Sequence, residues 1–522
     1  MEYQNPILTG FYPDPSVCRV GNDFYMVNST FEYLPGIPVF HSTDLVNWEQ
    51  IGHCITRASQ MEFSKAKSSG GLYAPTIRYH EGTFYVVCTN TSEGRFGNFY
   101  VTAKDPAGEW SDPIWVEQDG IDPSLLFDDD GTVYFTSNGM REVPGKCGPV
   151  NVIQQSRIAI DTGKLEDKPR VISLGTGGRC AEGPHLYKIN GWYYLLLAEG
   201  GTETGHMVTV FRSSSPWGPF EPGPDNPVLT ARDENRPELT GTGHADLIED
   251  ADGNWWFVFL CYRIATGKYH HLGRETALVP VIWENGWPKA AAGKAARINM
   301  RIPGLKEVIQ KSQSGEVFRD HFEKDSLDLK WNFIREFYDG YQIDTEKKML
   351  IIQGKPQTLS DQDCPAFIGR RQCHMDMECC VKMFFTPEEE WEEAGIAVIC
   401  SNRAHYDLGI RGGRTGRKLV LHKVVEDMES TVEIDLPEKE AEGLTRPENS
   451  GIELYIEADR ETYHFGYLEG GLKREVGSGL VKLLSTEVIW GFTGVYLGMY
   501  VTGNGRAESV EAGFKDFRYF GK

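Results

Sequence analysis

Residues 21–27 read GNDFYMV, a glycine turn followed by an aromatic-rich strand, and this phrase decides the fold because it occurs five times. The other copies are EGTFYVV at 81–87, DGTVYFT at 130–136, NGWYYLL at 190–196 and DGNWWFV at 252–258. The turn glycines lie 61, 49, 60 and 62 residues apart. Such spacing is typical of the blades of a β-propeller. We therefore expect an all-β chain with a five-bladed propeller at residues 1–300.

A second repeated feature is the head of the strand that precedes each copy. Because the innermost strands of a propeller all begin at the same end of the central channel, these heads should form one ring. They read DPSVCR from Asp14, APTIRY from Ala74, DPSLLF from Asp122, EGPHLY from Glu182 and GHADLI around His244. Carboxylates that converge raise one another's pKa or need a partner. Three carboxylates in the ring therefore point to an acid–base enzyme.

A structural alternative exists for each of these carboxylates. Asp-Pro-Ser, at Asp14 and Asp122, is a common turn opener in which the carboxylate caps nearby backbone N–H groups. Glu182, between Ala181 and Gly183, would be a solvated glutamate at a strand end. This alternative leaves unexplained why three carboxylates occur at matching positions of the repeat.

The bulk composition narrows the class of partner. The net charge of −22, from 75 acidic and 53 basic residues, predicts no nucleic-acid and no membrane partner and favours a neutral substrate. The start, MEYQNPILTGFYPDPS, lacks the basic and apolar regions of a secretion signal. Eleven cysteines without a C-x-x-C pair argue against a disulfide framework. We therefore expect a cytoplasmic protein.

The second half of the chain has a different pattern. Residues 270–288 complete the last blade, and we expect the ring to close by pairing a strand from one terminus with the blade begun by the other. Residues 301–315 are polar, contain IPG and SQSG, and predict a linker. From 316 to 522, alternating strands such as GIELYIEAD at 451–459 are typical of an antiparallel β-sandwich.

The two ends of this second domain are alike in sequence. FRDHF at 318–322 and FKDFRYF at 514–520 share their spacing of aromatic and acidic residues. We therefore expect these two terminal strands to lie side by side.

Several motifs together resemble glycoside hydrolase family 43. They are NPILTGFYPDPS from residue 5, APTIRYH, DPSLLFDDDG, AEGPHLYK, GTGHADLI and LGRETAL. The C-terminal half is similar to the sandwich appended to the β-xylosidases of this family. The resemblance implies a five-bladed propeller followed by a concanavalin-like jelly roll, at 316–522, that contributes to the active-site pocket.

The family also implies an inverting mechanism, with Asp14 as general base and Glu182 as general acid. Asp122 would hold the pKa of the acid up and orient it. Inversion needs a water molecule between two carboxyl groups about 6.5 to 9.5 Å apart. Asp14 and Glu182 lie on the first and fourth blades, which are not neighbours, and this leaves room for that water.

Five further residues match family positions around the sugar. Arg274 resembles the arginine that reaches the sugar hydroxyls and the acids, and Phe31 resembles the aromatic wall of the pocket. Phe492 resembles a residue inserted from the second domain, with core packing as the alternative for both phenylalanines. Tyr73 stands where many of these β-xylosidases have Trp, which puts the sugar preference in doubt. His244 would contact water or a divalent cation, or be a buried histidine without metal.

These residues predict an exo-acting glycosidase that releases xylose from the non-reducing ends of β-1,4-xylo-oligosaccharides, with α-L-arabinofuranosidase activity as a second capacity. The alternatives are a dedicated α-L-arabinofuranosidase acting on arabinoxylan or arabinan fragments, and a non-catalytic carbohydrate-binding propeller. We expect that no cofactor is required, and whether Ca²⁺ binds in the propeller channel stays open. Whether the protein forms a homo-oligomer also stays open.

Overall fold

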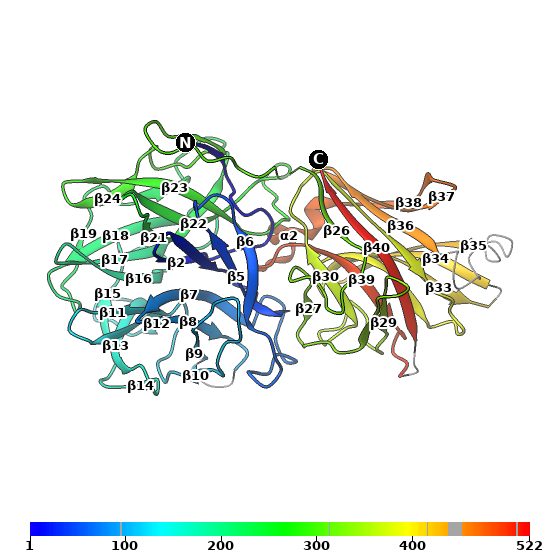
Figure 1. Cartoon of the computed structure of the whole chain (residues 1–522), viewed down its shortest axis with the longest axis horizontal. Helices are drawn as coiled ribbons and strands as arrows, with labels where there is room; N and C mark the ends of the chain where they lie inside the picture. The colour runs from blue at the N-terminus through cyan, green and yellow to red at the C-terminus, as the bar shows by residue number, and fades with distance from the viewer. Residues whose placement is uncertain (94–96, 313, 415, 437–450, 508–509) are drawn as a thin grey trace. The chain divides into compact units, whose positions relative to one another are not determined.

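In the computed structural model, which describes residues 1–522 except 94–96, 313, 415, 437–450 and 508–509, each copy of the repeated phrase forms a β-hairpin. The turn glycine of every copy has a positive φ, between 64° and 84°. Such φ values are favourable only for glycine, which explains why that residue recurs. The sequence prediction of five blades is confirmed (Figure 1).

Each blade is an antiparallel sheet whose strands follow the order of the sequence from the channel outward. The first is β2 (Ser16–Val20), β3 (Asp23–Val27), β5 (Gly36–Ser42) and β6 (Glu49–Ile55). The second is β7 (Leu72–His80), β8 (Thr83–Asn90), β9 (Asn98–Ala103) and β10 (Ile114–Trp115). The fifth is β21 (Thr240–Glu249), β22 (Trp255–Tyr262), β23 (Glu275–Glu284) and β24 (Trp287–Ala290).

The third and fourth blades each have a fifth short strand on the outer edge. The third is β11 (Ser124–Phe127), β12 (Val133–Arg141) and β13 (Val150–Ala159), with β14 (Lys164–Leu165) and β15 (Arg170–Ser173) both on β13. The fourth is β16 (Glu182–Ile189), β17 (Trp192–Glu199) and β18 (Met207–Ser213), with β19 (Glu221–Pro222) and β20 (Leu229–Thr230) both on β18.

The ring closes differently from the expectation. Among the described residues, no N-terminal strand joins the four strands of the fifth blade, although Leu8 forms an isolated antiparallel bridge with Thr276 on β23. Instead, β1 (Glu2–Gln4) pairs with β25 (Asn299–Arg301) in a separate two-stranded sheet. The Tyr3 hydroxyl donates to the Leu278 carbonyl at 2.9 Å and fastens the N-terminal segment to β23. The N-terminal segment is thus held by hydrogen bonds beside the last blade and does not supply one of the four strands of that blade.

The second domain is a sandwich of two antiparallel sheets whose facing sides form one apolar core. One sheet runs β28 (Tyr341–Asp344), β29 (Met349–Gln353), β40 (Glu511–Gly521), β31 (Met377–Phe384), β36 (Ile452–Ala458), β37 (Thr462–Glu469) and β38 (Leu472–Leu480). The other runs β30 (Phe367–Arg371), β39 (Tyr496–Thr502), β32 (Glu393–Ser401), β33 (Ala404–Gly413), β34 (Gly416–Val425) and β35 (Met428–Leu436).

The terminal strands of the sandwich lie side by side, as the sequence predicts. Strand β26 (Gly315–Asp320) pairs with β40 in antiparallel register, with Arg319 opposite Arg518. A 3₁₀ turn (Val481–Leu484) and the short helix α2 (Thr486–Ile489) follow β38. Among the described residues, no helix has the length and apolar character needed to cross a bilayer.

By their contacts the described residues divide into two compact units. The first unit comprises Met1–Ala66, Gly70–Arg263 and Arg274–Lys311, and the second comprises Lys67–Ser69, Ile264–Gly273 and Ser312–Lys522. Two short stretches inside the predicted first domain therefore belong to the second unit. Hydrogen bonds explain why: Val495 N–H donates to the His271 carbonyl at 3.0 Å, and Phe492 N–H donates to Ser69 Oγ at 2.8 Å.

Candidate active site

The head of every innermost strand carries one residue with a positive φ. These residues are Asp14 (52°), Ala74 (37°), Asp122 (54°), Gly183 (55°) and His244 (47°). A positive φ is unfavourable for residues other than glycine, and strained backbone of this kind is concentrated at functional sites. The five-fold recurrence shows that the repeat builds one ring at the channel mouth.

The backbone corrects one position of the predicted ring. In the fourth blade Gly183, not Glu182, is equivalent to Asp14 and Asp122, and Glu182 precedes it by one residue. The pairing of β16 with β17 shifts register between Glu182 and His185, which marks a bulge at this point. The signal was present in the sequence, because a proline follows Asp14, Ala74, Asp122 and Gly183 alike.

Asp14 is buried, at 5% exposure, and lies among hydrogen-bond donors. Ser29 Oγ donates to Oδ2 at 2.6 Å, Arg274 Nη1 donates to Oδ1 at 3.0 Å, and His244 Nδ1 lies 3.5 Å from Oδ1. Burial alone would raise the pKa of Asp14, but Arg274, His244 and Ser29 together hold it below its usual value. Asp14 is therefore an ionised carboxylate across the neutral range.

Asp122 and Glu182 have the opposite electrostatic character. Burial and the nearby Asp14 carboxylate raise the pKa of Asp122, whose Oδ2 accepts the Gly183 N–H at 3.0 Å. Burial, followed by the charges of Asp122 and Asp14, raises the pKa of Glu182 to about 8. In the described part of the chain, no side chain or backbone group is hydrogen-bonded to the Glu182 carboxyl. Glu182 is thus a protonated acid whose proton is available to a ligand.

Arg274 and two aromatic rings border Asp14. The Arg274 guanidinium lies 5.5 Å from the Phe31 ring centroid, and Phe31 lies 4.7 Å from the Tyr73 ring centroid. Phe31 is itself strained, with a φ of 53°, and is 2% exposed. Burial and the Glu32 carboxylate raise the pKa of Tyr73 to about 12, and its hydroxyl interacts with Thr91. The first unit therefore brings Phe31, Tyr73 and Arg274 together.

The sequence did not predict two residues that lie near the Asp14 and Arg274 pair. Thr202 Oγ1 accepts a hydrogen bond from Arg274 Nη1 at 3.3 Å. His206 is 1% exposed, and its Nδ1 pairs with the Gly241 carbonyl at 3.0 Å. Burial lowers the pKa of His206 to about 3, so this ring is neutral. Neither residue lies in a repeated motif, so no sequence signal identified it.

Comparison with known proteins places this site in a family. Residues 3–288 match the model of glycosyl hydrolases family 43, and residues 319–520 match the model of the beta xylosidase C-terminal concanavalin A-like domain. A protein of Bacteroides ovatus named non-reducing end alpha-L-arabinofuranosidase BoGH43B is 42% identical over 99% of this chain and 94% of its own. The chain belongs to glycoside hydrolase family 43.

A second family 43 relative and a solved structure also match along nearly the whole length. A xylosidase/arabinosidase of Butyrivibrio fibrisolvens is 35% identical over 99% of this chain and 98% of its own. The solved structure described as Bacteroides ovatus Xyloglucan PUL GH43B superimposes with a TM-score of 0.90 at 40% identity and covers 100% of both chains. The protein is therefore an inverting glycosidase with the propeller and concanavalin-like domains of this family.

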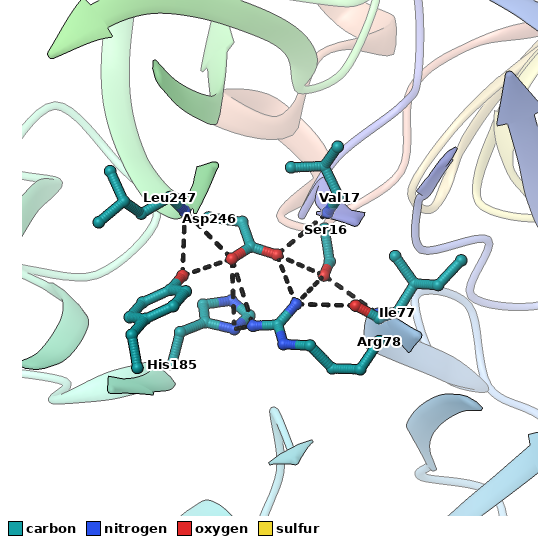
Figure 2. A network of polar contacts seen from close by, with 8 residues as sticks. Ser16, Val17, Ile77, Arg78, His185, Asp246 and Leu247 are labelled. Atoms are coloured by element: carbon teal, nitrogen blue, oxygen red, sulfur yellow. Dashed lines mark hydrogen bonds and ion pairs between the residues drawn. The ribbon is translucent and has the colours of Figure 1, made fainter. Parts of the chain in front are cut away.

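One layer further along the channel, the family 43 propeller holds a buried polar network. Ser16, His185 and Asp246 each lie two residues beyond the ring head of their blade, and Arg78 reaches them from the second blade. Figure 2 shows the Arg78 guanidinium between Asp246 and Ser16, with His185 beside it. We call Ser16, Arg78, His185 and Asp246 the channel layer.

The side chains do not offer Ca²⁺ the ligand set it needs. Ca²⁺ takes six to eight oxygen ligands, whereas His244 supplies one nitrogen and lies against Asp14. Within the described ranges, no group of three or more His, Cys, Asp or Glu side chains is arranged to hold a metal ion. No step of the reaction is therefore assigned to a metal.

Phe492 belongs to the second unit. Its ring centroid lies 5.6 Å from that of Trp490, and its backbone N–H is held by Ser69 Oγ. Trp490 is 74% exposed, so the two rings do not form part of the sandwich core. The contribution of Phe492 to the sugar pocket stays a prediction.

Proposed function

We propose that this enzyme removes single xylose units from the non-reducing ends of β-1,4-xylo-oligosaccharides and also cleaves terminal α-L-arabinofuranosides. The observation that carries the proposal is the opposite tuning of two carboxyl groups, the buried Asp14 and the partly buried Glu182. The pKa of Asp14 is held low, while that of Glu182 is raised to about 8. Environments that push two carboxyl pKa values apart identify the base and the acid of a glycosidase.

In the proposed mechanism Asp14 accepts a proton from water as that water attacks the anomeric carbon. Glu182 donates its proton to the glycosidic oxygen as the bond to the leaving sugar breaks. Asp122 raises the pKa of Glu182 by its charge and fixes the following residue through the Gly183 N–H. Arg274 keeps Asp14 ionised and is placed to contact sugar hydroxyls.

A dedicated α-L-arabinofuranosidase is the second candidate. The relative from Bacteroides ovatus, 42% identical, carries that name. Xylopyranosides and arabinofuranosides present similar hydroxyl groups to one pocket, so the three carboxylates would serve either substrate. The sugar preference then depends on the residues that border Asp14, such as Phe31 and Tyr73.

Initial rates on an aryl β-xyloside and an aryl α-L-arabinofuranoside test the proposal. We expect turnover of both, with the xyloside faster. Proton NMR of the first-formed sugar should show inversion, because water attacks opposite the leaving group. Turnover of the arabinofuranoside alone would establish the second candidate. Initial release of β-xylose from the β-xyloside would require a covalent intermediate and contradict the assigned roles.

Replacing Tyr73 with Trp is expected to raise the ratio of xylosidase to arabinofuranosidase kcat/KM by about three- to tenfold. The larger ring adds stacking area for a pyranose, which is worth about 0.5 to 1.5 kcal/mol. Tyr73→Phe is the matched control, because it removes only the hydroxyl that interacts with Thr91. An unchanged ratio in Tyr73→Trp would show that residue 73 only packs against Phe31.

We also propose that the enzyme works in a reducing compartment such as the cytoplasm. In support, all eleven cysteines are free thiols. Eight of them are buried, among them Cys54 and Cys88, whose pKa values are raised by burial. Thiols of this kind are packing residues and depend on remaining reduced. Fractionation of the native cells with an activity assay would test the location.

A further inference from the structure

The channel layer contains one cation, Arg78, whose side chain is 15% exposed and whose guanidinium is hydrogen-bonded to Asp246, Ser16 and His185. Arg78 Nη1 donates to Asp246 Oδ2 at 2.9 Å and to Ser16 Oγ at 3.3 Å. Arg78 Nη2 donates to His185 Nδ1 at 3.0 Å and to Asp246 Oδ1 at 3.3 Å. One guanidinium therefore bridges residues of the first, fourth and fifth blades from its own place on the second.

The Asp246 carboxylate accepts six hydrogen bonds, two of them from Arg78, and therefore has no lone pair left for another cation. Its Oδ2 accepts from Ser16 Oγ at 2.6 Å, Val17 N–H at 3.0 Å and Arg78. Its Oδ1 accepts from the Tyr187 hydroxyl, Leu247 N–H at 3.1 Å and Arg78 (Figure 2). The Asp246 side chain is fully buried. A carboxylate satisfied in this way is fixed in one orientation.

The chain itself joins the channel layer to the ring of strand heads that includes Asp14 and His244, which we call the catalytic ring. Asp246 lies two residues beyond His244, and Ser16 lies two residues beyond Asp14. Two residues of chain span at most about 7 Å, so each of these channel-layer residues lies close behind a ring residue of its own blade. The His185 and His244 rings also meet edge to face, with centroids 6.3 Å apart. A shift of Asp246 or Ser16 would therefore displace His244 and Asp14.

We propose that Arg78 is the built-in cation of the propeller channel and acts as a positioning residue for the catalytic ring. Its guanidinium neutralises Asp246 and links four innermost strands, a task that a divalent cation could otherwise perform. The enzyme therefore works without a bound metal. Arg78 does not touch the reacting atoms but fixes the places of Asp14 and His244.

The test measures both the melting temperature and kcat/KM after dialysis against EDTA, and again in CaCl₂ or MgCl₂. Wild-type enzyme should give the same values in all three solutions. Arg78→Ala should lower Tm by roughly 5 to 15 °C, because it leaves a buried carboxylate without its partner. It should also lower kcat about 10²-fold through misplaced catalytic groups. The kcat measurement rests on the proposed function, whereas the Tm measurement does not.

Adding cations to Arg78→Ala distinguishes two roles of Arg78, namely positioning through its charge and simple packing. In Arg78→Ala, either CaCl₂ or methylguanidinium should restore part of the lost Tm and kcat, because Asp246 and His185 then face an empty space. The matched control is Arg157→Ala, which removes an ion pair between β13 and Asp167, a residue of the segment that joins β14 to β15. We expect this variant to gain no dependence on added cations.

Three results would overturn the proposal. The first is a loss of Tm or activity of the wild-type enzyme in EDTA. The second is an Arg78→Ala variant that matches the wild type. The third is an impaired Arg78→Ala variant that no cation restores. If Arg78→Ala fails to fold, Arg78→Lys and Arg78→Gln replace it: greater retention of Tm and kcat by Lys supports the proposal, and equal retention overturns it.

Discussion

Replacing Asp14 with Asn is expected to reduce kcat by about 10²- to 10⁴-fold on every substrate, because the variant cannot accept the proton of the attacking water. The loss should be independent of the leaving group, since the base acts on water and not on the glycosidic oxygen. Steady-state rates on aryl glycosides with good and poor leaving groups measure this. The amide oxygen still accepts from Ser29, so the fold should persist.

Asp128→Asn is the matched control for Asp14→Asn. Asp128 is also buried, at 6% exposure, and pairs with Lys188 Nζ at 2.5 Å, outside the ring of strand heads. We expect it to keep the wild-type kcat. A large loss in both variants would mean that removing any buried carboxylate of the propeller impairs activity. The role of Asp14 as a base would then be rejected.

Replacing Glu182 with Gln is expected to reduce kcat by a similar factor, about 10²- to 10⁴-fold, only on substrates whose leaving group needs a proton. With a dinitrophenolate leaving group the variant should recover much of the wild-type rate. Equal losses on activated and unactivated substrates would contradict the role of Glu182 as the acid. A recovery in Asp14→Asn instead would exchange the two roles.

The pH profile provides an independent check on Glu182. The acid works only while protonated, so wild-type kcat/KM should fall as pH rises through about 8, the pKa of Glu182. The base works only while ionised, and the lowered pKa of Asp14 keeps it ionised well into the acidic range. In Glu182→Gln the alkaline decline should disappear. A decline that persists in this variant would belong to another group.

The blades and their order were predictable from the sequence because they depend on short-range contacts. Gly21 and its four equivalents must adopt positive φ, which no other residue does at comparable cost, and the aromatic strand follows directly. The pairing of β26 with β40 was predictable for another reason, since their sequences are alike. Ring closure through β1 and β25 was not, because many arrangements of the termini satisfy the same edge strands.

The members of the site were predictable as residue types, but their relation was not. Alignment on the aromatic strands placed Glu182 in the ring, while the backbone places Gly183 there and Glu182 one residue earlier. A bulge in β16 causes this offset, and a bulge depends on how two strands pair. Thr202 and His206 lay outside every motif, and only folding brought Thr202 to Arg274 and His206 close to Asp14.

The sequence by itself therefore determined a five-bladed propeller, an attached sandwich and three carboxylates at the heads of innermost strands. The tertiary structure decided which carboxylate is ionised and which is protonated, and it placed the Arg78 guanidinium in the channel. The physical reason is the distance along the chain over which each property is determined. A turn is fixed by a few neighbouring residues, whereas a pKa depends on burial and on charges such as Arg274, which lies 260 residues from Asp14 along the chain and 3.0 Å from it in space.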